Sequence, residues 1–88
     1  MKYISDEDKM RVALDEARKA LDIDEVPVGA AIFDKDDNLI CANHNRRELD
    51  QNPMSHAEIL VLEEASQILG TWRLDETTIC LLYTSDAA

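Results

Sequence analysis

The order of hydrophobic and polar positions divides the chain into five segments of regular structure. In the first of these, Ser5 followed three residues later by Asp8 is typical of a helix N-terminus. Apolar residues then recur at helical spacing, at Met10, Ala13, Leu14, Ala17, Ala20 and Leu21. The pattern predicts a helix over residues 5–22, and Pro27 stops any continuation of it.

Two short apolar runs follow, at residues 28–33 and 39–43, with a turn-forming polar cluster at 34–38 between them. This arrangement predicts a β-hairpin. Because the first run is apolar throughout, we expect a strand that is covered on both faces, with a helix packed on each side of the sheet. Gly29 suits a position where another group approaches the backbone closely, or equally one where a helix packs against the strand.

A second helix is predicted over residues 55–69, and Gly70 is placed to end it. Its expected buried stripe comprises Ile59, Leu62, Ala65, Ser66 and Leu69, with Glu63 and Glu64 on the solvated side. A third strand is predicted at about 77–83. The order α-β-β-α-β predicts an α/β fold in which the third strand runs parallel to the second and leaves an open sheet edge.

The composition is that of one small globular domain of 88 residues, 45% hydrophobic and 32% charged. No apolar run approaches the roughly 18 residues of a membrane span, and residues 1–8 do not resemble a secretory signal. We therefore expect a cytoplasmic protein with no membrane partner. Cys41 and Cys80 are too few and too far apart for a disulfide framework, and each is interpreted as a small core residue.

The net charge of −10 limits the possible partners. Such a chain repels a phosphate backbone unless its nine Lys and Arg residues gather on one face. Arg46 and Arg47 are adjacent, but they do not make a nucleic-acid patch by themselves. Composition alone therefore gives no support for an RNA partner.

The most informative motif is His56-Ala57-Glu58, which lies where a loop becomes the second predicted helix. Residues i and i+2 do not share one flank of a helix, so a site that uses both His56 and Glu58 must lie off the helix N-terminus. An anionic group bound there would be stabilised by the helix dipole. The alternative is that His56 caps the helix or lies on the surface, and that Glu58 is a first-turn acid complementing the dipole.

Four segments in order and spacing resemble the bacterial tRNA-specific adenosine deaminases of the cytidine/deoxycytidylate deaminase superfamily. The resemblance covers residues 25 to about 81. The segments are Glu25-Val26-Pro27-Val28-Gly29-Ala30, Asn45-Arg46, Ser55-His56-Ala57-Glu58-Ile59-Leu60 and Thr71-Trp72-Arg73-Leu74. The resemblance implies a three-layer α/β/α cytidine-deaminase-like fold, here truncated after α-β-β-α-β.

The same resemblance implies an activity, which is zinc-dependent hydrolytic deamination of adenosine to inosine in tRNA, at the wobble position. It implies Zn²⁺ as cofactor with His56 as a metal ligand, and Glu58 as the catalytic proton shuttle. The implied substrate-binding residues are Asn45, Val28, Gly29 and the backbone of Ala57. The implied partners are tRNA and, in the full-length parent protein, a second copy in a homodimer.

The chain departs from the family after its third strand, where the family has a Pro-Cys-x-x-Cys segment with two thiolate ligands. Neither proline nor cysteine occurs at the equivalent place near residue 85. We expect residues 1–81 to be the N-terminal part of a deaminase domain, residues 82–88 to be a non-native tail, and the 88-residue chain to be inactive alone. A free-base or nucleoside (guanine or cytosine) deaminase and a non-catalytic binding or dimerising module remain as alternatives.

Overall fold

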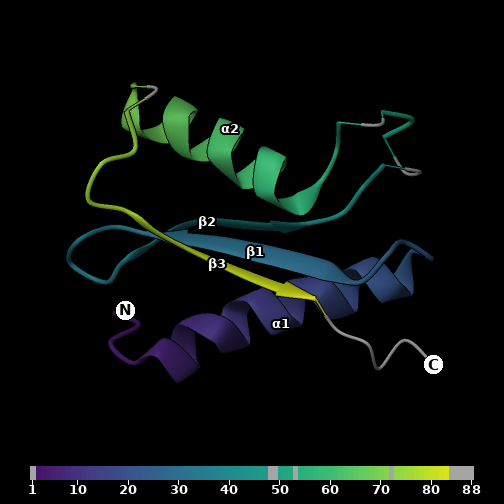
Figure 1. The fold of residues 1–88 in the computed structure, drawn as a ribbon, viewed down its shortest axis with the longest axis horizontal. Helices are drawn as coiled ribbons and strands as arrows, with labels where there is room; N and C mark the ends of the chain where they lie inside the picture. Colours follow the sequence, from purple (N-terminus) through teal and green to yellow (C-terminus); the bar gives the residue numbers. More distant parts are fainter. Residues whose placement is uncertain (1, 48–49, 53, 72, 84–88) are drawn as a thin grey trace.

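The computed structural model describes residues 2–47, 50–52, 54–71 and 73–83 of the chain. Its regular elements are α1 (Asp6–Asp22), β1 (Val28–Phe33), β2 (Leu39–His44), α2 (Ala57–Leu69) and β3 (Thr78–Tyr83). All five predicted elements are present in the predicted order. The two helices lie on opposite faces of the sheet, which gives three layers, as Figure 1 shows. The α/β/α fold predicted from the sequence is therefore confirmed.

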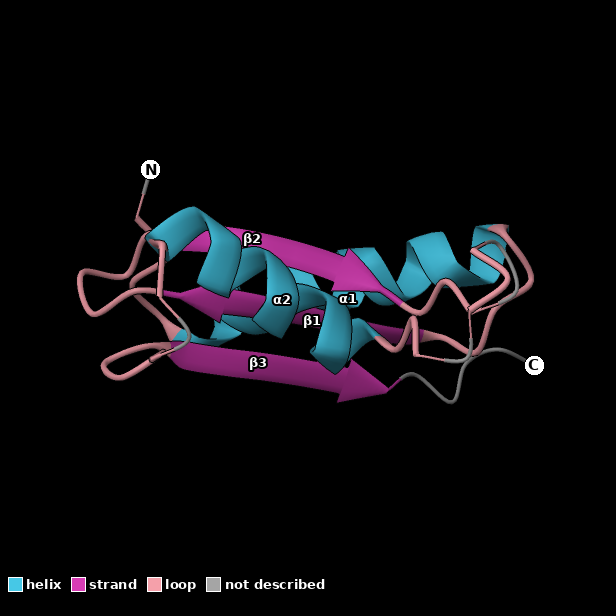
Figure 2. Cartoon of the chain, turned by 90° about the horizontal axis from the view of Figure 1, so that it is seen from above, coloured by secondary structure: helices cyan, strands magenta, loops and turns pink. Residues whose placement is uncertain are grey.

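The sheet has the strand order β2-β1-β3, and β1 is antiparallel to both neighbours. β2 and β3 consequently run in the same direction, as predicted, although β1 lies between them (Figure 2). Among the described residues β3 forms an edge of the sheet, which agrees with the predicted open edge. The central strand contacts both helices, and α2 also packs against β2.

β1 is buried along its whole length, which confirms that both of its faces are covered. Val28, Ala30 and Ile32 belong to a core cluster that also includes residues of β2 and α2. The alternate residue Gly29 faces α1, because a Cβ built on it would lie 1.9 Å from the backbone oxygen of Ala13. Of the two interpretations of Gly29, helix packing is the one that the structure supports.

α1 begins as the sequence predicts, since the Ser5 hydroxyl accepts a hydrogen bond from the Asp8 N–H at 3.1 Å. Its buried small residues are Ala13, Ala17 and Ala20, which allow the helix backbone to approach β1 closely. The helix also buries Lys9 and Glu16, two charged residues that the hydrophobic pattern did not place in the interior.

The predicted buried stripe of α2 is wrong in most of its positions. The buried residues are Ala57, Val61 and Ala65, whereas Leu62 and Leu69 are 42% and 44% exposed. α2 is apolar on nearly every side, so its sequence periodicity does not determine which side faces the sheet. The small side chains face β1 and β2 because they permit a close approach. Gly70 ends the helix at a φ of 70°, as predicted.

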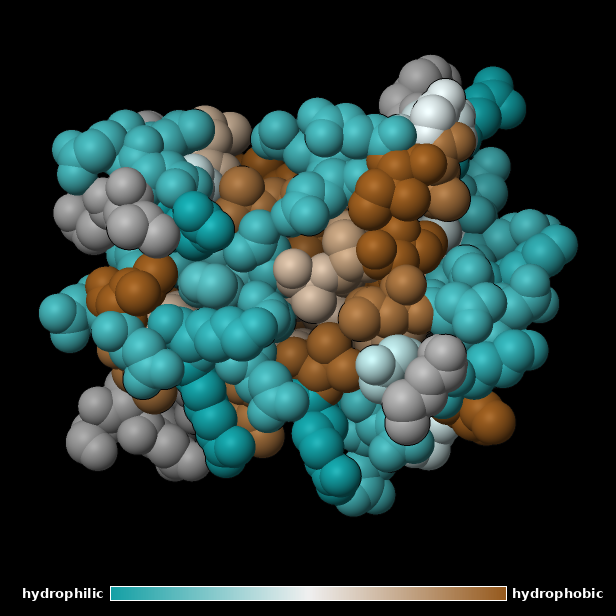
Figure 3. Space-filling model, turned by 180° about the vertical axis from the view of Figure 1, so that it is seen from behind, coloured by the Kyte–Doolittle hydropathy of each residue, from teal (hydrophilic) through white to brown (hydrophobic). Residues whose placement is uncertain are grey.

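Several large apolar side chains remain on the surface, among them Leu62 and Ile68 of α2 and Leu39 of β2. The view from behind shows hydrophobic residues gathered among hydrophilic ones (Figure 3). Cys41 is buried as predicted, and Cys80 is partly exposed. Within the described ranges, no helix has the length and apolar character needed to cross a bilayer.

Three features singled out in the sequence fall wholly or partly on residues outside the described ranges. They are Trp72 of the fourth family segment, Pro53 ahead of the His56 motif, and residues 84–88 of the expected non-native tail. The first two residues of that tail, Leu82 and Tyr83, belong to β3 and pair in register with Gly29 and Val28. The boundary at residue 81 stays a prediction.

Candidate active site

A pocket of about 160 Å³ opens at the N-terminal end of α2. Four residues implicated by the sequence line it together, namely Val28, Asn45, His56 and Glu58. They come from β1, from the residue that follows β2, and from the start of α2. Val26, Arg47 and Tyr83 complete the lining. A site that uses both His56 and Glu58 was expected off the helix tip, and the pocket lies there.

His56 is the N-cap residue of α2, with extended backbone at φ −80° and ψ 146°. Its imidazole makes no capping hydrogen bond to the helix. The capping role considered for His56 is therefore not performed by its side chain. Glu58 lies in the first turn of the helix, and both side chains are half-buried. The pocket thus has an imidazole and a carboxylate in its lining, beside the positive end of a helix dipole.

Asn45 fastens the start of α2 to the sheet. The residue is 5% exposed, and its Oδ1 accepts a hydrogen bond from the Ala57 N–H at 2.8 Å. Its own N–H donates to the Val28 carbonyl at 3.2 Å, which extends the pairing of β1 and β2 by one residue. Asn45 therefore occupies the capping role that His56 leaves open, and it also lines the pocket.

Two of the implied substrate-binding residues do not line this pocket. The side-chain position of Gly29 faces α1, on the opposite face of the sheet. Ala57 is fully buried at the base of α2, and its N–H already donates to Asn45. A base could hydrogen-bond the Ala57 N–H only by displacing the Asn45 oxygen. The roles of Gly29 and Ala57 in substrate binding stay predictions.

The loop before α2 is braced by polar contacts around Asp50. One carboxylate oxygen of Asp50 accepts from the Arg46 guanidinium at 3.2 Å, and the other accepts from the Ser55 hydroxyl at 3.0 Å. The Arg46 N–H also donates to the Ser55 carbonyl at 2.8 Å. Arg46 is therefore paired within the loop, while its neighbour Arg47 is exposed and lines the pocket.

The metal ligand set is incomplete in the described part of the chain. Catalytic zinc sites commonly use three protein ligands. Within residues 2–47, 50–52, 54–71 and 73–83, no three His, Cys, Asp or Glu side chains come together as a group able to hold a metal ion. These residues do not by themselves fit a Zn²⁺ ion, and the role of His56 as a metal ligand stays a prediction.

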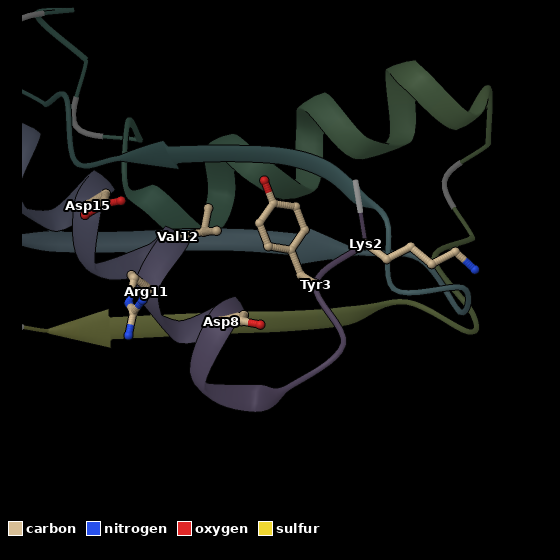
Figure 4. Close-up of a pocket in the computed structure, with 6 residues that line it drawn as sticks. All are labelled: Lys2, Tyr3, Asp8, Arg11, Val12 and Asp15. Atoms are coloured by element: carbon tan, nitrogen blue, oxygen red, sulfur yellow. The ribbon is translucent and has the colours of Figure 1, made fainter.

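A larger pocket, of about 250 Å³, lies elsewhere on the molecule, between the N-terminal segment and α1. Figure 4 shows Tyr3 beside the helix, with Asp8, Arg11 and Asp15 along α1 and Lys2 extending away from them. Its charged groups are of both signs, and it contains neither a histidine nor a buried acid. The smaller pocket at α2 is the better candidate because it alone of the two combines an imidazole, a carboxylate and a buried amide.

Comparison with known proteins places these residues in a family. The family model for MafB19-like deaminases matches residues 4–84. The chain belongs to this deaminase family. The tRNA-specific adenosine deaminase of Bacillus subtilis strain 168 is 45% identical over 74 residues, which are 84% of this chain and 45% of that protein. The deaminase chain described here thus spans about half the length of the curated relatives it matches.

Solved structures agree with the family assignment. One comes from a study of A-to-I editing by tRNA:A34 deaminases at the wobble position. It superposes with a TM-score of 0.79 at 37% identity, over 83% of this chain and 55% of that one. A guanine deaminase from Nitrosomonas europaea superposes with a TM-score of 0.79 at 29% identity, over 92% of this chain and 47% of that one. The cytidine-deaminase-like fold expected from the sequence is confirmed.

Sequence reasoning missed a polar pair close to the site. Glu16 of α1 and His44 at the end of β2 form a hydrogen bond of 2.8 Å, and both are largely buried. Two signals were available. Glu16 lies beside the small residues of the buried face of α1, and His44 lies at the end of a strand whose first four residues are apolar.

Proposed function

We propose that this chain is the N-terminal part of an enzyme that converts adenosine to inosine in tRNA, at the wobble position. The observation that carries the proposal is the convergence of His56, Glu58, Asn45 and Val28 on one pocket at the tip of α2. The likeness to tRNA-specific adenosine deaminases supports tRNA as the substrate. We also propose a cytoplasmic location, the compartment that holds tRNA in bacteria such as the source of the Bacillus subtilis relative.

The proposed reaction replaces the amine at C6 of adenine with an oxygen from water and releases ammonia. A proton must leave the water, and protons must reach ring atom N1 and the departing amine. A positioned carboxylate can carry them. We assign this role to Glu58, which lines the pocket from the first turn of α2. Asn45 and Val28 would contact the nucleoside from the sheet side of the pocket.

Arg47 supports an RNA substrate over a free base. Its exposed side chain lines the pocket, whereas the neighbouring Arg46 is paired with Asp50. A cation at the pocket rim can contact a backbone phosphate beside the target nucleotide, a group that free guanine or cytosine does not have. Arg47 lines the pocket although the whole chain carries a net charge of −10.

The cofactor is proposed for the complete protein alone. His56 would be one Zn²⁺ ligand, and the remaining ligands would come from a part of the complete protein that the 88 residues do not include. We also propose that the complete protein forms a homodimer. The 88-residue chain is expected to bind zinc at well below one equivalent and to show no deamination. Elemental analysis that finds one zinc ion per purified chain would contradict this expectation.

The test uses the complete protein, obtained by amplifying the gene from its source. Purified enzyme is given an anticodon stem-loop with adenosine at the wobble position, and free guanine and cytosine in parallel. We expect inosine from the stem-loop and no product from the bases. In Glu58→Gln the rate should fall by about 10²–10⁴, the usual contribution of general acid–base catalysis.

Glu63→Gln is the matched control, since Glu63 is an exposed acid on the same helix and does not line the pocket. It should keep the full rate. Faster turnover of guanine than of the stem-loop would assign the enzyme to free bases instead. A zinc-loaded protein that deaminates none of these compounds would point to a non-catalytic module.

A further inference from the structure

Glu16 and His44 form a buried polar contact between α1 and the end of β2. His44 Nδ1 lies 2.8 Å from Glu16 Oε1, and the two side chains are 13% and 11% exposed. The other oxygen of the same carboxylate, Oε2, accepts from Lys19 Nζ at 2.7 Å. Both oxygens of Glu16 are therefore hydrogen-bonded, and the Lys19 end of the cluster reaches solvent.

The protonation state of Glu16 determines the direction of this hydrogen bond. Burial alone would raise the pKa of Glu16, but the hydrogen bonds from Lys19 and His44 outweigh it, and the pKa lies below its ordinary value of 4.5. Glu16 is thus an ionised carboxylate at neutral pH, and such a group can only accept hydrogen bonds. It follows that Nδ1 of His44 bears a hydrogen and donates it to Glu16.

His44 is followed directly by Asn45, and successive side chains of a strand point to opposite faces of the sheet. His44 contacts α1 on one face, and Asn45 accepts from the Ala57 N–H of α2 on the other. Between them the backbone is held to β1 by the bond from the Asn45 N–H to the Val28 carbonyl. Residues 44 and 45 thus make hydrogen bonds to both helices, at the end of the sheet where the pocket lies.

We propose that Glu16 and His44 are a positioning pair, which acts through Asn45 to hold the first turn of α2 and the two pocket residues on it. His56 and Glu58 flank Ala57, so a shift of the Ala57 anchor moves both. The assignment of this role to a deaminase site rests on the proposed function, whereas the mechanical link does not. Without the carboxylate, the end of β2 loses its fixed contact on the α1 face, and the Asn45–Ala57 bond opens more often.

The test is amide hydrogen exchange by NMR on the complete protein. The quantity measured is the exchange rate of the Ala57 amide relative to that of Ala31, which lies at the centre of the sheet. In Glu16→Leu we expect this ratio to rise about tenfold, the effect of losing one typical hydrogen bond. Glu16→Gln keeps an acceptor of the same shape and should restore most of the protection.

Lys9→Met is the matched control. Lys9 also joins α1 to the β1–β2 hairpin through a partly buried ion pair, with Asp37 at 2.8 Å, but at the opposite end from the pocket. Loss of a merely structural tether raises the exchange of all amides together and leaves the ratio unchanged. An unchanged ratio in Glu16→Leu, or an equal rise in Lys9→Met, would overturn the proposal.

A second measurement needs no variant. The ¹⁵N shifts of the His44 ring in the unaltered chain should show a protonated Nδ1 at neutral pH. A ring protonated on Nε2 alone would refute the hydrogen bond on which the pair depends. Neither measurement involves substrate, so a failed deamination assay would refute the proposed function and leave the pair intact. Failure of the exchange test would refute the role of the pair and leave the proposed function intact.

Discussion

Gly29→Ala tests the close packing of α1 on β1. A Cβ at position 29 would lie 1.9 Å from the Ala13 carbonyl oxygen and 2.5 Å from the Ala17 backbone nitrogen. Real Cβ atoms do not approach other atoms this closely. Both neighbours are helix backbone, which cannot rotate away as a flexible side chain would. The helix as a whole must move off the sheet, or the strand must bend.

The expected loss of stability is large for one methyl group. Overpacking a core commonly costs about 1–3 kcal/mol, and rigid neighbours put this position at the upper end, at about 3 kcal/mol or more. A domain of this length typically has about 4–13 kcal/mol of unfolding free energy in total. The substitution should therefore remove a large fraction of it and lower the folded-to-unfolded ratio by at least about a hundredfold.

The assay is urea unfolding followed by circular dichroism, with Gly70→Ala as the control. Gly70 has a φ of 70° and no atom within 4 Å of an added Cβ, so alanine there meets strain without a clash. We expect a loss of about 1–2 kcal/mol for Gly70→Ala, from the left-handed backbone alone. The contrast between the two variants isolates the effect of helix contact.

Near-wild-type stability of Gly29→Ala, within about 0.5 kcal/mol, would refute the packing argument. If the same variant of the complete enzyme were stable yet bound its substrate poorly, Gly29 would belong to the base pocket, as the family resemblance implies. The two roles of Gly29 thus predict opposite results in stability and binding.

Three further predictions follow from the structure. Asn45→Ala removes the acceptor of the Ala57 N–H and should lower the unfolding free energy by about 1–2 kcal/mol, measured by urea titration. The pKa of Glu16 is lowered in the folded chain, so its ionised form stabilises the fold above pH 4.5, and this contribution is lost as the pH falls below that value. In thermal melts, the melting temperature of Glu16→Gln should therefore fall less on acidification than that of the unaltered chain. Burial raises the pKa of Cys41 to about 11, so iodoacetamide at pH 8 should leave Cys41 unmodified in the folded chain and alkylate it in urea; labelling of Cys41 at equal rates in both would contradict its burial.

Local features of the sequence determined the elements and their ends. Ser5 begins α1 through its own hydroxyl, Gly70 ends α2 in a left-handed conformation, and the unbroken apolar run of β1 predicted a strand covered on both faces. These signals act within a few residues, through backbone geometry and capping. The position of His56 and Glu58 at a helix tip is also a local feature, because their spacing alone predicted that a common site would lie off the N-terminus of the helix.

Tertiary structure decided the contacts between residues far apart in the chain. The side of α2 that faces the sheet depended on which side chains, Ala57, Val61 and Ala65, let the helix approach most closely. The hydrogen bond from Ala57 to Asn45 and the pair of Glu16 with His44 join residues 12 and 28 positions apart. A sequence pattern does not specify such pairs, since each forms only after the chain has folded and a helix packs against the end of β2.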